Sequence, residues 1–219
     1  MCNRMANTVT QEDIAAWFEI DDIVAYPGPS YNIAPGRKIA AIVEKDESRR
    51  LGELLWGLIP RWSKDGKFNF NMANARGESI YEKPTFKECY EKRRCLIPAT
   101  GFFEWRHEGD KKIPVHYRLR DDKLFAFAGV WDAWKGDGER KNTCAVITTE
   151  PNGLVSPTHD RMPVILHRED EPVWLDHSLD PEDLLDLLVP YPEELMVAYE
   201  VDPRVGNVRF DDPVCVVPL

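Results

Sequence analysis

Short apolar runs separated by proline and glycine constrain the fold of this chain more than any other feature. Several of them alternate apolar and polar residues, as strands with one buried face do. The chain has 17 prolines and 13 glycines to punctuate them. The pattern predicts an α+β fold, with a mainly antiparallel, partly closed β-sheet and flanking helices. The strand-like runs are KIAAIVE, RLGELLWG, RRCLIPA, IPVHYRL, KLFAFAGVWDAW, CAVITT, ELMVAYE and VCVVPL.

Helical patterns are fewer and shorter than the strand-like runs. The segment from Thr10 to about Ile20 reads as an amphipathic helix, with Thr10 and Asp13 in capping positions. A second helix is expected from Thr85 to Arg93. A third is expected to begin at the cap Asp180 and to run through Leu188. These helices are expected to cover the sheet.

Length and composition predict one domain over residues 1–219, because 219 residues can bury a sizeable core and no composition break divides them. The first 20 residues lack the apolar centre of a signal peptide, and no stretch approaches the roughly 18 apolar residues of a membrane span. We therefore expect no membrane association and a cytoplasmic protein that works as a monomer.

Charge is unevenly distributed. The formal net charge of −10 opposes general affinity for nucleic acid, which depends on neutralising phosphates. Residues 56–106, however, carry ten Lys and Arg against six Asp and Glu, a net charge of +4. The sequence thus allows one basic face on an acidic protein. A solvated surface with no partner fits the charges equally well.

The five cysteines form no CxxC pair and lie near no histidine at a zinc-ligand spacing. Neither disulfides nor a metal site are expected, and no motif indicates another cofactor. Four of the cysteines lie in or beside apolar or helical runs, where buried, inert thiols are usual. Cys2 is the one that lies in no such run.

Cys2 has a chemistry that an internal cysteine lacks. Removal of Met1 would expose an α-amine and a thiol on the same residue. An α-amine has a pKa near 8, so roughly a tenth is unprotonated at neutral pH and can attack an aldehyde. The thiol can then close onto the resulting Schiff base to give a five-membered thiazolidine. A cysteine at position 2 is weak evidence by itself.

Three further motifs carry residues suited to this chemistry. Asn74, Arg76 and Glu78 lie in NMANARGES, Glu104 lies between two aromatic residues in GFFEWRH, and SPTHDRMP contains a histidine and an arginine. A carboxyl group among aromatic side chains tends to have a raised pKa, as a general acid requires. Simpler interpretations exist for each: a solvent-facing strand residue, a loop histidine bonded to backbone, surface arginines and core tryptophans.

The sequence resembles the SOS response associated peptidase (SRAP) family of abasic-site processing proteins over nearly its whole length. The matching pieces are long and occur in the same order. They are MCNR from Met1, YNIAPG from Tyr31, WGLIPRW from Trp56, NAR from Asn74, CLIPATGFFEW from Cys95, ITTEP from Ile147 and THDRMP from Thr158.

The resemblance implies that the protein crosslinks to abasic sites in single-stranded DNA through a thiazolidine. Cys2 would be the nucleophile, Asn74 would orient its α-amine, and Glu104 would shuttle protons. His159 would protonate the sugar ring oxygen or stabilise the opened sugar. The expected DNA contacts are phosphate contacts by Arg4, Arg76 and Arg161 with help from Thr149, and apolar contacts by Trp62 and Trp105.

One residue departs from the family pattern, which usually has glycine after the cysteine. This chain has Asn3, and asparagine tolerates positive φ better than other non-glycine residues. Two other functions remain open at this stage. One is a cysteine peptidase or amino-terminal nucleophile hydrolase, with Cys2 as nucleophile and His159 as base, which could also remove Met1 itself. The other is a non-covalent binder of single strands.

Overall fold

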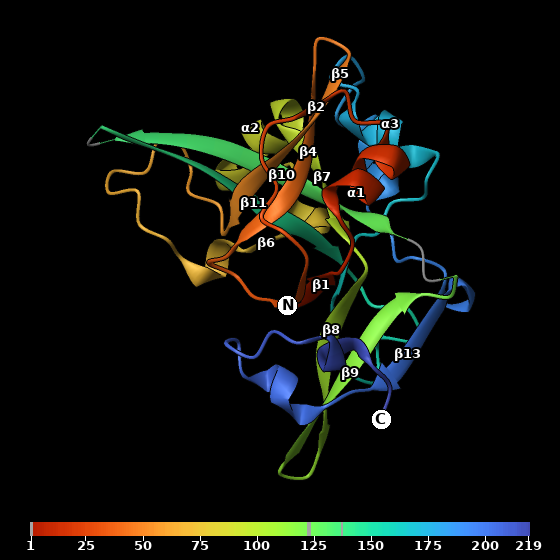
Figure 1. The fold of residues 1–219 in the computed structure, drawn as a ribbon. Helices are drawn as coiled ribbons and strands as arrows, with labels where there is room; N and C mark the ends of the chain where they lie inside the picture. Colours follow the sequence, from red (N-terminus) through yellow and green to blue (C-terminus); the bar gives the residue numbers. More distant parts are fainter. Residues whose placement is uncertain (1, 122–123, 137) are drawn as a thin grey trace.

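The computed structural model describes residues 2–121, 124–136 and 138–219, and two β-sheets form most of it. Figure 1 shows the larger sheet in the upper part of the molecule, beside the helices, and the smaller sheet below it. The expectation of an α+β fold with a mainly antiparallel, partly closed sheet is confirmed. Assignment of the chain to a single domain stays a prediction.

The larger sheet has the order β12-β11-β10-β7-β4-β5-β2, and β6 pairs with β11. Its antiparallel hairpins β4–β5 and β10–β11 come from the expected runs. A short parallel pairing of Leu55 and Trp56 in β5 with Thr143 and Cys144 in β11 joins the two ends, so five strands close into a barrel. The strands are β2 (Asp22–Ile23), β4 (Lys38–Lys45), β5 (Ser48–Trp56), β6 (Asn74–Arg76), β7 (Arg94–Ala99), β10 (Phe125–Gly136), β11 (Glu139–Thr149) and β12 (Met162–Pro163).

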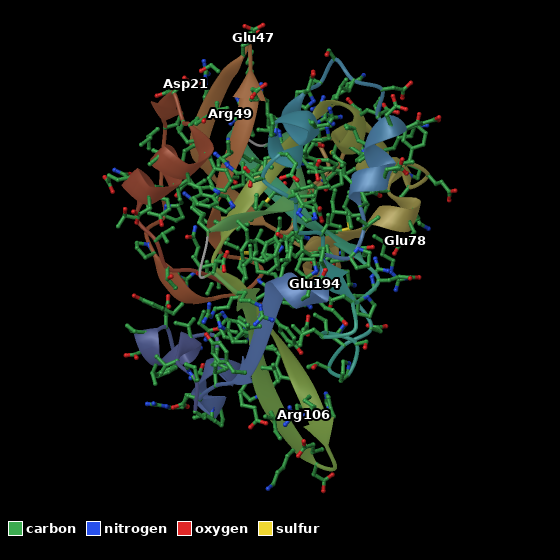
Figure 2. All side chains as sticks on the ribbon, turned by 90° about the vertical axis from the view of Figure 1, so that its right-hand side faces the viewer. Asp21, Glu47, Arg49, Glu78, Arg106 and Glu194 are labelled. Carbon is green, nitrogen blue, oxygen red and sulfur yellow. The ribbon has the colours of Figure 1, made fainter. Side chains whose placement is uncertain are left out.

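The smaller sheet has the order β13-β9-β8-β1-β3, and all its pairings are antiparallel. The amino-terminal strand β1 therefore lies inside the sheet, between β8 and β3. The far end of the β8–β9 hairpin extends away from the rest of the molecule and carries Arg106 (Figures 1 and 2). The strands are β1 (Met5–Asn7), β3 (Ser30–Ile33), β8 (Gly101–Glu108), β9 (Lys111–Leu119) and β13 (Met196–Glu200).

The first two expected helices are present. Helix α1 spans Gln11–Phe18, and Thr10 and Asp13 form a reciprocal capping box at its start. Helix α2 spans Pro84–Lys92 with proline in its first turn. A further helix, α3 (Asp170–Leu175), has no counterpart among the expected elements. Short 3₁₀ helices are η1 (Phe70–Met72), η2 (Gly77–Ser79), η3 (Asp183–Leu187), η4 (Glu193–Leu195), η5 (Pro203–Gly206) and η6 (Pro213–Val216).

Two expected elements were wrong in type. The segment after Asp180 forms the 3₁₀ helix η3 and not an α-helix. The run VCVVPL forms η6, because Asp212 accepts a hydrogen bond from the backbone of Val214 and so starts a 3₁₀ turn. Only an isolated bridge, between Val201 and Pro218, gives this carboxyl-terminal segment a strand-like contact.

Buried side chains form two large clusters on the two faces of the barrel strands, and one small cluster beneath the carboxyl-terminal segment. The first large cluster includes Cys2, Trp56 and Phe127, and continues into the smaller sheet through Phe102 and Tyr117, whose rings stack. All five cysteines are free and buried. No helix in the described part of the chain is long and apolar enough to cross a membrane.

Candidate functional site

Cys2 lies inside the protein, although no apolar run surrounds it in the sequence. Its side chain is 1% exposed, and its thiol donates a hydrogen bond to the carbonyl oxygen of Arg4 at 3.7 Å. The segment is held there because β1 pairs with β8, and the backbone N–H of Phe103 donates to the same carbonyl at 3.0 Å. Burial raises the pKa of the Cys2 thiol, and the nearby Glu104 carboxyl raises it further.

Glu104 lies on β8 with its carboxyl group turned into the protein. The residue is 4% exposed, and burial raises the pKa of its carboxyl to about 8. Its Oε1 atom is buried and has no hydrogen-bond partner in the part of the chain that the structure describes. A carboxyl group in this state can donate a proton at neutral pH and take one back, as general acid–base catalysis requires.

Asn74 approaches the amino-terminal segment from the larger sheet. It begins β6, which pairs in parallel with β11 and fixes the backbone of residues 74–76. Its Nδ2 donates to the side-chain oxygen of Asn3 at 2.8 Å. Its Oδ1 is buried without a partner among the described residues and can accept a hydrogen bond.

Asn3 therefore has a role that the sequence did not indicate. It is not among the residues with positive φ, so the backbone here does not need the glycine that the family usually has. The side-chain oxygen of Asn3 instead accepts a hydrogen bond from Nδ2 of Asn74. This bond leaves Oδ1 of Asn74 available to another donor.

His159 lies on the loop of residues 150–161, which leads from β11 to β12. Burial lowers the pKa of its imidazole, so the ring is mainly neutral at pH 7. Nδ1 accepts a hydrogen bond from the backbone N–H of Arg161 at 3.0 Å. In a neutral ring that accepts at Nδ1, the proton is on Nε2, and that nitrogen is a donor.

The four residues expected to carry the chemistry are brought to one region from separate parts of the chain. The charge of Glu104 raises the pKa of both Cys2 and Tyr117, and the charge of Asp160, next to His159, raises that of Glu104. The hydroxyl groups of Tyr117 and Thr158 are hydrogen-bonded, which ties the histidine loop to β9. The site is thus assembled by both sheets and one loop.

The arginines expected to bind phosphates differ in their surroundings. Arg76 is exposed, and no ion pair or side-chain hydrogen bond joins it to another described residue. Arg4 is buried: its Nη1 donates to Asn32 Oδ1 at 2.7 Å and to the carbonyl of Val205 at 2.5 Å. Its guanidinium thus serves to hold the carboxyl-terminal segment.

Arg161 is also engaged within the protein. Its two terminal nitrogens donate to both carboxylate oxygens of Glu78, at 2.6 and 2.8 Å. Nη2 also donates to the carbonyl of Thr148 at 2.6 Å. The sequence indicated Glu78 as part of the motif NMANARGES but assigned it no role at the site. Its exposed position beside an exposed arginine motif gave no signal that it would bind a distant arginine.

The remaining expected DNA contacts are an exposed tryptophan, a packed tryptophan and a buried threonine. Trp62 is 64% exposed. Trp105 is half-buried, and the guanidinium carbon of Arg4 lies 5.2 Å from its ring centroid. Thr149 is buried at the end of β11, opposite Met162.

Trp62 does not stand alone on the surface. Phe68 and Phe70 are also exposed, by 42% and 49%, and all three line a groove of about 710 Å³ together with Lys67. Exposed aromatic rings beside cations are typical of surfaces on which unpaired bases stack. The two phenylalanines were not singled out in the sequence, although KFNFNM alternates polar and apolar residues as a strand would.

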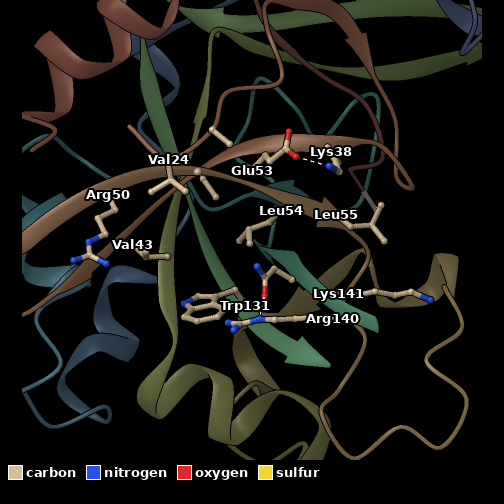
Figure 3. A pocket seen from close by; sticks show the side chains of 14 residues that line it. Val24, Lys38, Val43, Arg50, Glu53, Leu54, Leu55, Trp131, Arg140 and Lys141 are labelled. Carbon is tan, nitrogen blue, oxygen red and sulfur yellow. Dashed lines mark hydrogen bonds and ion pairs between the residues drawn. The ribbon is translucent and has the colours of Figure 1, made fainter. Parts of the chain in front are cut away.

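Another cavity, of about 560 Å³, opens between the hairpins β4–β5 and β10–β11 (Figure 3). Leu54 and Trp131 form part of its wall, and Arg50 from β5 and Arg140 from β11 also line it. None of the four residues expected to carry the chemistry lines this cavity. The described residues contain no group of three or more His, Cys, Asp or Glu that could hold a metal ion.

Comparisons with known proteins identify the family of this chain. The family model for SOS response associated peptidase (SRAP) matches residues 1–208. The chain is 42% identical to the abasic site processing protein YoqW of Bacillus subtilis, over 97% of each chain. It is 31% identical to the abasic site processing protein YedK of Escherichia coli, over the whole of both chains.

A solved structure has the same fold. The crystal structure of a protein from Bacteroides thetaiotaomicron superposes with a TM-score of 0.89, at 31% identity and over the whole of both chains. The site residues also lie within the matched region. The chain therefore belongs to the SOS response associated peptidase (SRAP) family.

Proposed function

We propose that this protein recognises abasic sites in single-stranded DNA and bonds covalently to them through Cys2, as a thiazolidine. The proposal rests on the aminothiol that Cys2 provides once Met1 is removed, and on the abasic site processing proteins among its relatives. Met1 lies outside the described residues. Its removal, by the protein itself or by another enzyme, is part of the proposal.

The reaction has two bond-forming steps. The α-amine of Cys2 attacks the aldehyde carbon, and the carbonyl oxygen leaves as water to give the Schiff base. The thiol sulfur then bonds to the same carbon of the protonated Schiff base and loses its proton, and the ring nitrogen keeps one of the two protons of the original amine. Glu104, with a pKa of about 8, delivers a proton to the departing oxygen and accepts the thiol proton.

Asn74 and His159 would act on the two reactants. The unpartnered Oδ1 of Asn74 is suited to accept a hydrogen bond from the α-amine and so to aim its lone pair. The Nε2–H of a neutral His159 is suited to donate to the ring oxygen of the sugar, which assists ring opening to the aldehyde.

The single observation that carries the proposal is the state of the Cys2 thiol. It is buried beside a carboxyl group, and both raise its pKa. Cysteine peptidases need the opposite, a thiolate whose pKa is lowered by a cationic neighbour. An amine that attacks first, followed by a thiol that gives up its proton only as the ring closes, suits this environment better.

For DNA contact we propose Arg76 together with the exposed surface of Trp62, Phe68 and Phe70. Rings of this kind can stack on the bases that flank the lesion. Arg161 and Arg4 already bind groups within the protein, and a phosphate would reach Arg161 only by sharing it with Glu78. We further propose that the protein acts as a monomer in the cytoplasm and joins the nucleoid when bound to DNA.

The test is the intact mass of the protein after incubation with a single-stranded oligonucleotide that carries one abasic site. We expect a stable adduct equal to protein plus strand minus one water. A matched oligonucleotide with tetrahydrofuran at the site, which has no aldehyde, should give none. Reversible binding to both strands without an adduct would favour the non-covalent binder. Catalytic cleavage of a peptide that depends on Cys2, again without an adduct, would favour the peptidase.

A further inference from the structure

The loop of residues 150–161 has little regular structure of its own to hold it in place. It lies between β11 and β12 and is built of turns. Near its start, the side chain of Asn152 donates to the carbonyl of Tyr191 at 2.7 Å. Further along, Thr158 is hydrogen-bonded to Tyr117. The end of the loop, next to His159, is held by Arg161.

Arg161 is itself held by Glu78, which lies on η2 directly after β6. The two guanidinium–carboxylate bonds are parallel and short, at 2.6 and 2.8 Å. Paired bonds of this kind fix direction as well as distance. The bond from Nη2 to the carbonyl of Thr148 adds a third contact, so the side chain has little freedom. Figure 2 shows Glu78 at the edge of the molecule.

The imidazole of His159 has two contacts at Nδ1 next to this arrangement. Nδ1 accepts from the backbone N–H of Arg161 at 3.0 Å, but it also lies 2.9 Å from Oδ1 of Asp160. A neutral ring can satisfy only one of these contacts, because the first needs a bare Nδ1 and the second a protonated one. The carboxylate of Asp160 is largely solvated, with 86% of its side chain exposed.

We propose that Glu78 is a positioning residue for His159. By holding Arg161, it keeps the backbone N–H of that residue on Nδ1 and so selects the tautomer with its proton on Nε2. This inference rests on the proposed function for its effect on crosslinking, in which the Nε2–H donates to the sugar. Its effect on the tautomer is independent of the function.

The same segment also carries Asn74, four residues before Glu78. The ion pair therefore ties the strand that positions one reacting group to the loop that positions the other. Loss of the carboxylate should disturb His159 more than Asn74, since β6 remains paired with β11.

The experiment compares Glu78→Gln and Glu78→Asp with Glu150→Gln. Glu150 is exposed at the start of the same loop, so its variant removes the same charge without the ion pair. The first measurement is the pair of ¹⁵N chemical shifts of the His159 ring, which distinguish the two tautomers. The second is the crosslinking rate at saturating abasic strand. The third is the affinity for the unreactive tetrahydrofuran strand.

We expect Glu78→Gln to mix the two tautomers and to slow crosslinking about tenfold. This is less than the roughly 10²-fold loss from a misplaced group, because some of the rings keep the productive tautomer. Glu78→Asp, which keeps the charge, should recover part of both. Affinity should change by less than about threefold, and Glu150→Gln should match the wild type. Circular dichroism will show whether Glu78→Gln folds. If it does not, Glu78→Asp is used in its place, and we expect a partial change of the His159 ring shifts and of the crosslinking rate.

Two results would overturn the inference: wild-type ring shifts in both Glu78 variants, or a rate loss explained wholly by weaker DNA affinity. Failure of the proposed function looks different. In that case the wild type forms no adduct at all, while the ring shifts of the variants still decide whether Glu78 sets the tautomer of His159.

Discussion

The carboxyl group of Glu104 and the thiol of Cys2 lie close enough inside the protein for the charge of one to raise the pKa of the other. Burial is the larger cause of the raised pKa in both groups. Each therefore keeps its proton at neutral pH. A pair of this kind is poised to exchange a proton when one member forms a covalent bond.

The aminothiol of Cys2 sets the first prediction. Cys2→Ala should abolish the heat-stable adduct, and Cys2→Ser should give at best a weaker one, because oxygen closes the analogous ring less favourably. An uncleaved amino-terminal tag should also block the reaction, since it turns the α-amine into an amide. Denaturing gels without borohydride provide the measurement. A heat-stable adduct from Cys2→Ala would exclude the thiazolidine.

The second prediction concerns the protonation state of Glu104. Glu104→Gln keeps the shape of the side chain but cannot transfer a proton, so crosslinking should slow by about 10²-fold. Binding to a tetrahydrofuran strand should stay nearly unchanged. Single-turnover crosslinking from pH 6 to 8 measures the effect. Equal rates for the two proteins across this range would assign Glu104 a structural role only.

The same carboxyl group should make stability depend on pH. Its pKa rises from 4.5 in an ordinary environment to about 8 in the fold, so the folded protein holds a proton that the unfolded chain releases. The resulting stability is complete below pH 4.5 and is lost as the pH rises to about 8. Between pH 5 and 8, Glu104→Gln should gain on the wild type by on the order of 3 kcal/mol in unfolding free energy.

Urea unfolding of both proteins at several pH values gives this difference directly. His116, buried with its pKa lowered to about 3, also makes stability depend on pH, but it does so equally in both proteins and cancels. A difference that stays constant with pH would show that Glu104 is ionised in the fold.

The exposed arginine of the site should contribute one phosphate contact. Arg76→Gln should reduce the slope of log affinity against log salt by about 0.7 for a single strand. Because Arg4 and Arg161 are engaged internally, the wild-type slope should be shallower than about −2, the value for three contacts. Arg140→Gln, which removes an exposed arginine from the cavity in Figure 3, is the control and should leave the slope unchanged.

A further prediction concerns the preference for single-stranded over duplex DNA. A duplex would bring many phosphates near an acidic surface and keep the abasic sugar stacked, whereas a single strand can bend into the site. Crosslinking should therefore be much faster on the single strand than on the same strand annealed to its complement. A slope near −7, or equal rates on both forms, would reveal a broad duplex-binding surface.

Gly101, at the start of β8, should resist substitution. A Cβ there would lie 2.1 Å from Nε2 of His116 and 2.8 Å from the carbonyl oxygen of Tyr117. Gly101→Ala should therefore lower the unfolding free energy by about 2 kcal/mol. Gly52→Ala, on β5 with no atom within 4 Å of the new Cβ, should change it by less than about 0.5 kcal/mol. Equal midpoints in urea would contradict this account of β8.

Much of the fold could be predicted because local patterns decide it. Alternating strands and the cap at Thr10 report on their own neighbourhood, and these elements were identified. Closure of the barrel depends on β5 meeting β11, nearly 90 residues later, and no local pattern reports on that contact. The segment at 213–216 was wrongly predicted as a strand. Its apolar residues fit a strand pattern, but Asp212 caps a 3₁₀ helix there.

The site could be predicted as a set of residues but not as an arrangement. Motifs indicated Cys2, Glu104 and His159, yet the burial of Cys2 follows from its neighbours on β8 and not from the residues beside it. The internal partners of Arg4 and Arg161 lie far away in the chain. The sequence position of an arginine does not reveal whether its guanidinium will bind a DNA phosphate or a group within the protein.

The position of β1 inside the smaller sheet also sets an order of events during synthesis. β1 cannot pair with β8 until Gly101 and Phe102 have been made. At the usual pace of translation, that is roughly 5 to 20 s after the first residues are joined. Through this interval β1 lacks its long-range partner. In the proposed function, this interval is the time in which Met1 can be removed before β1 pairs with β8.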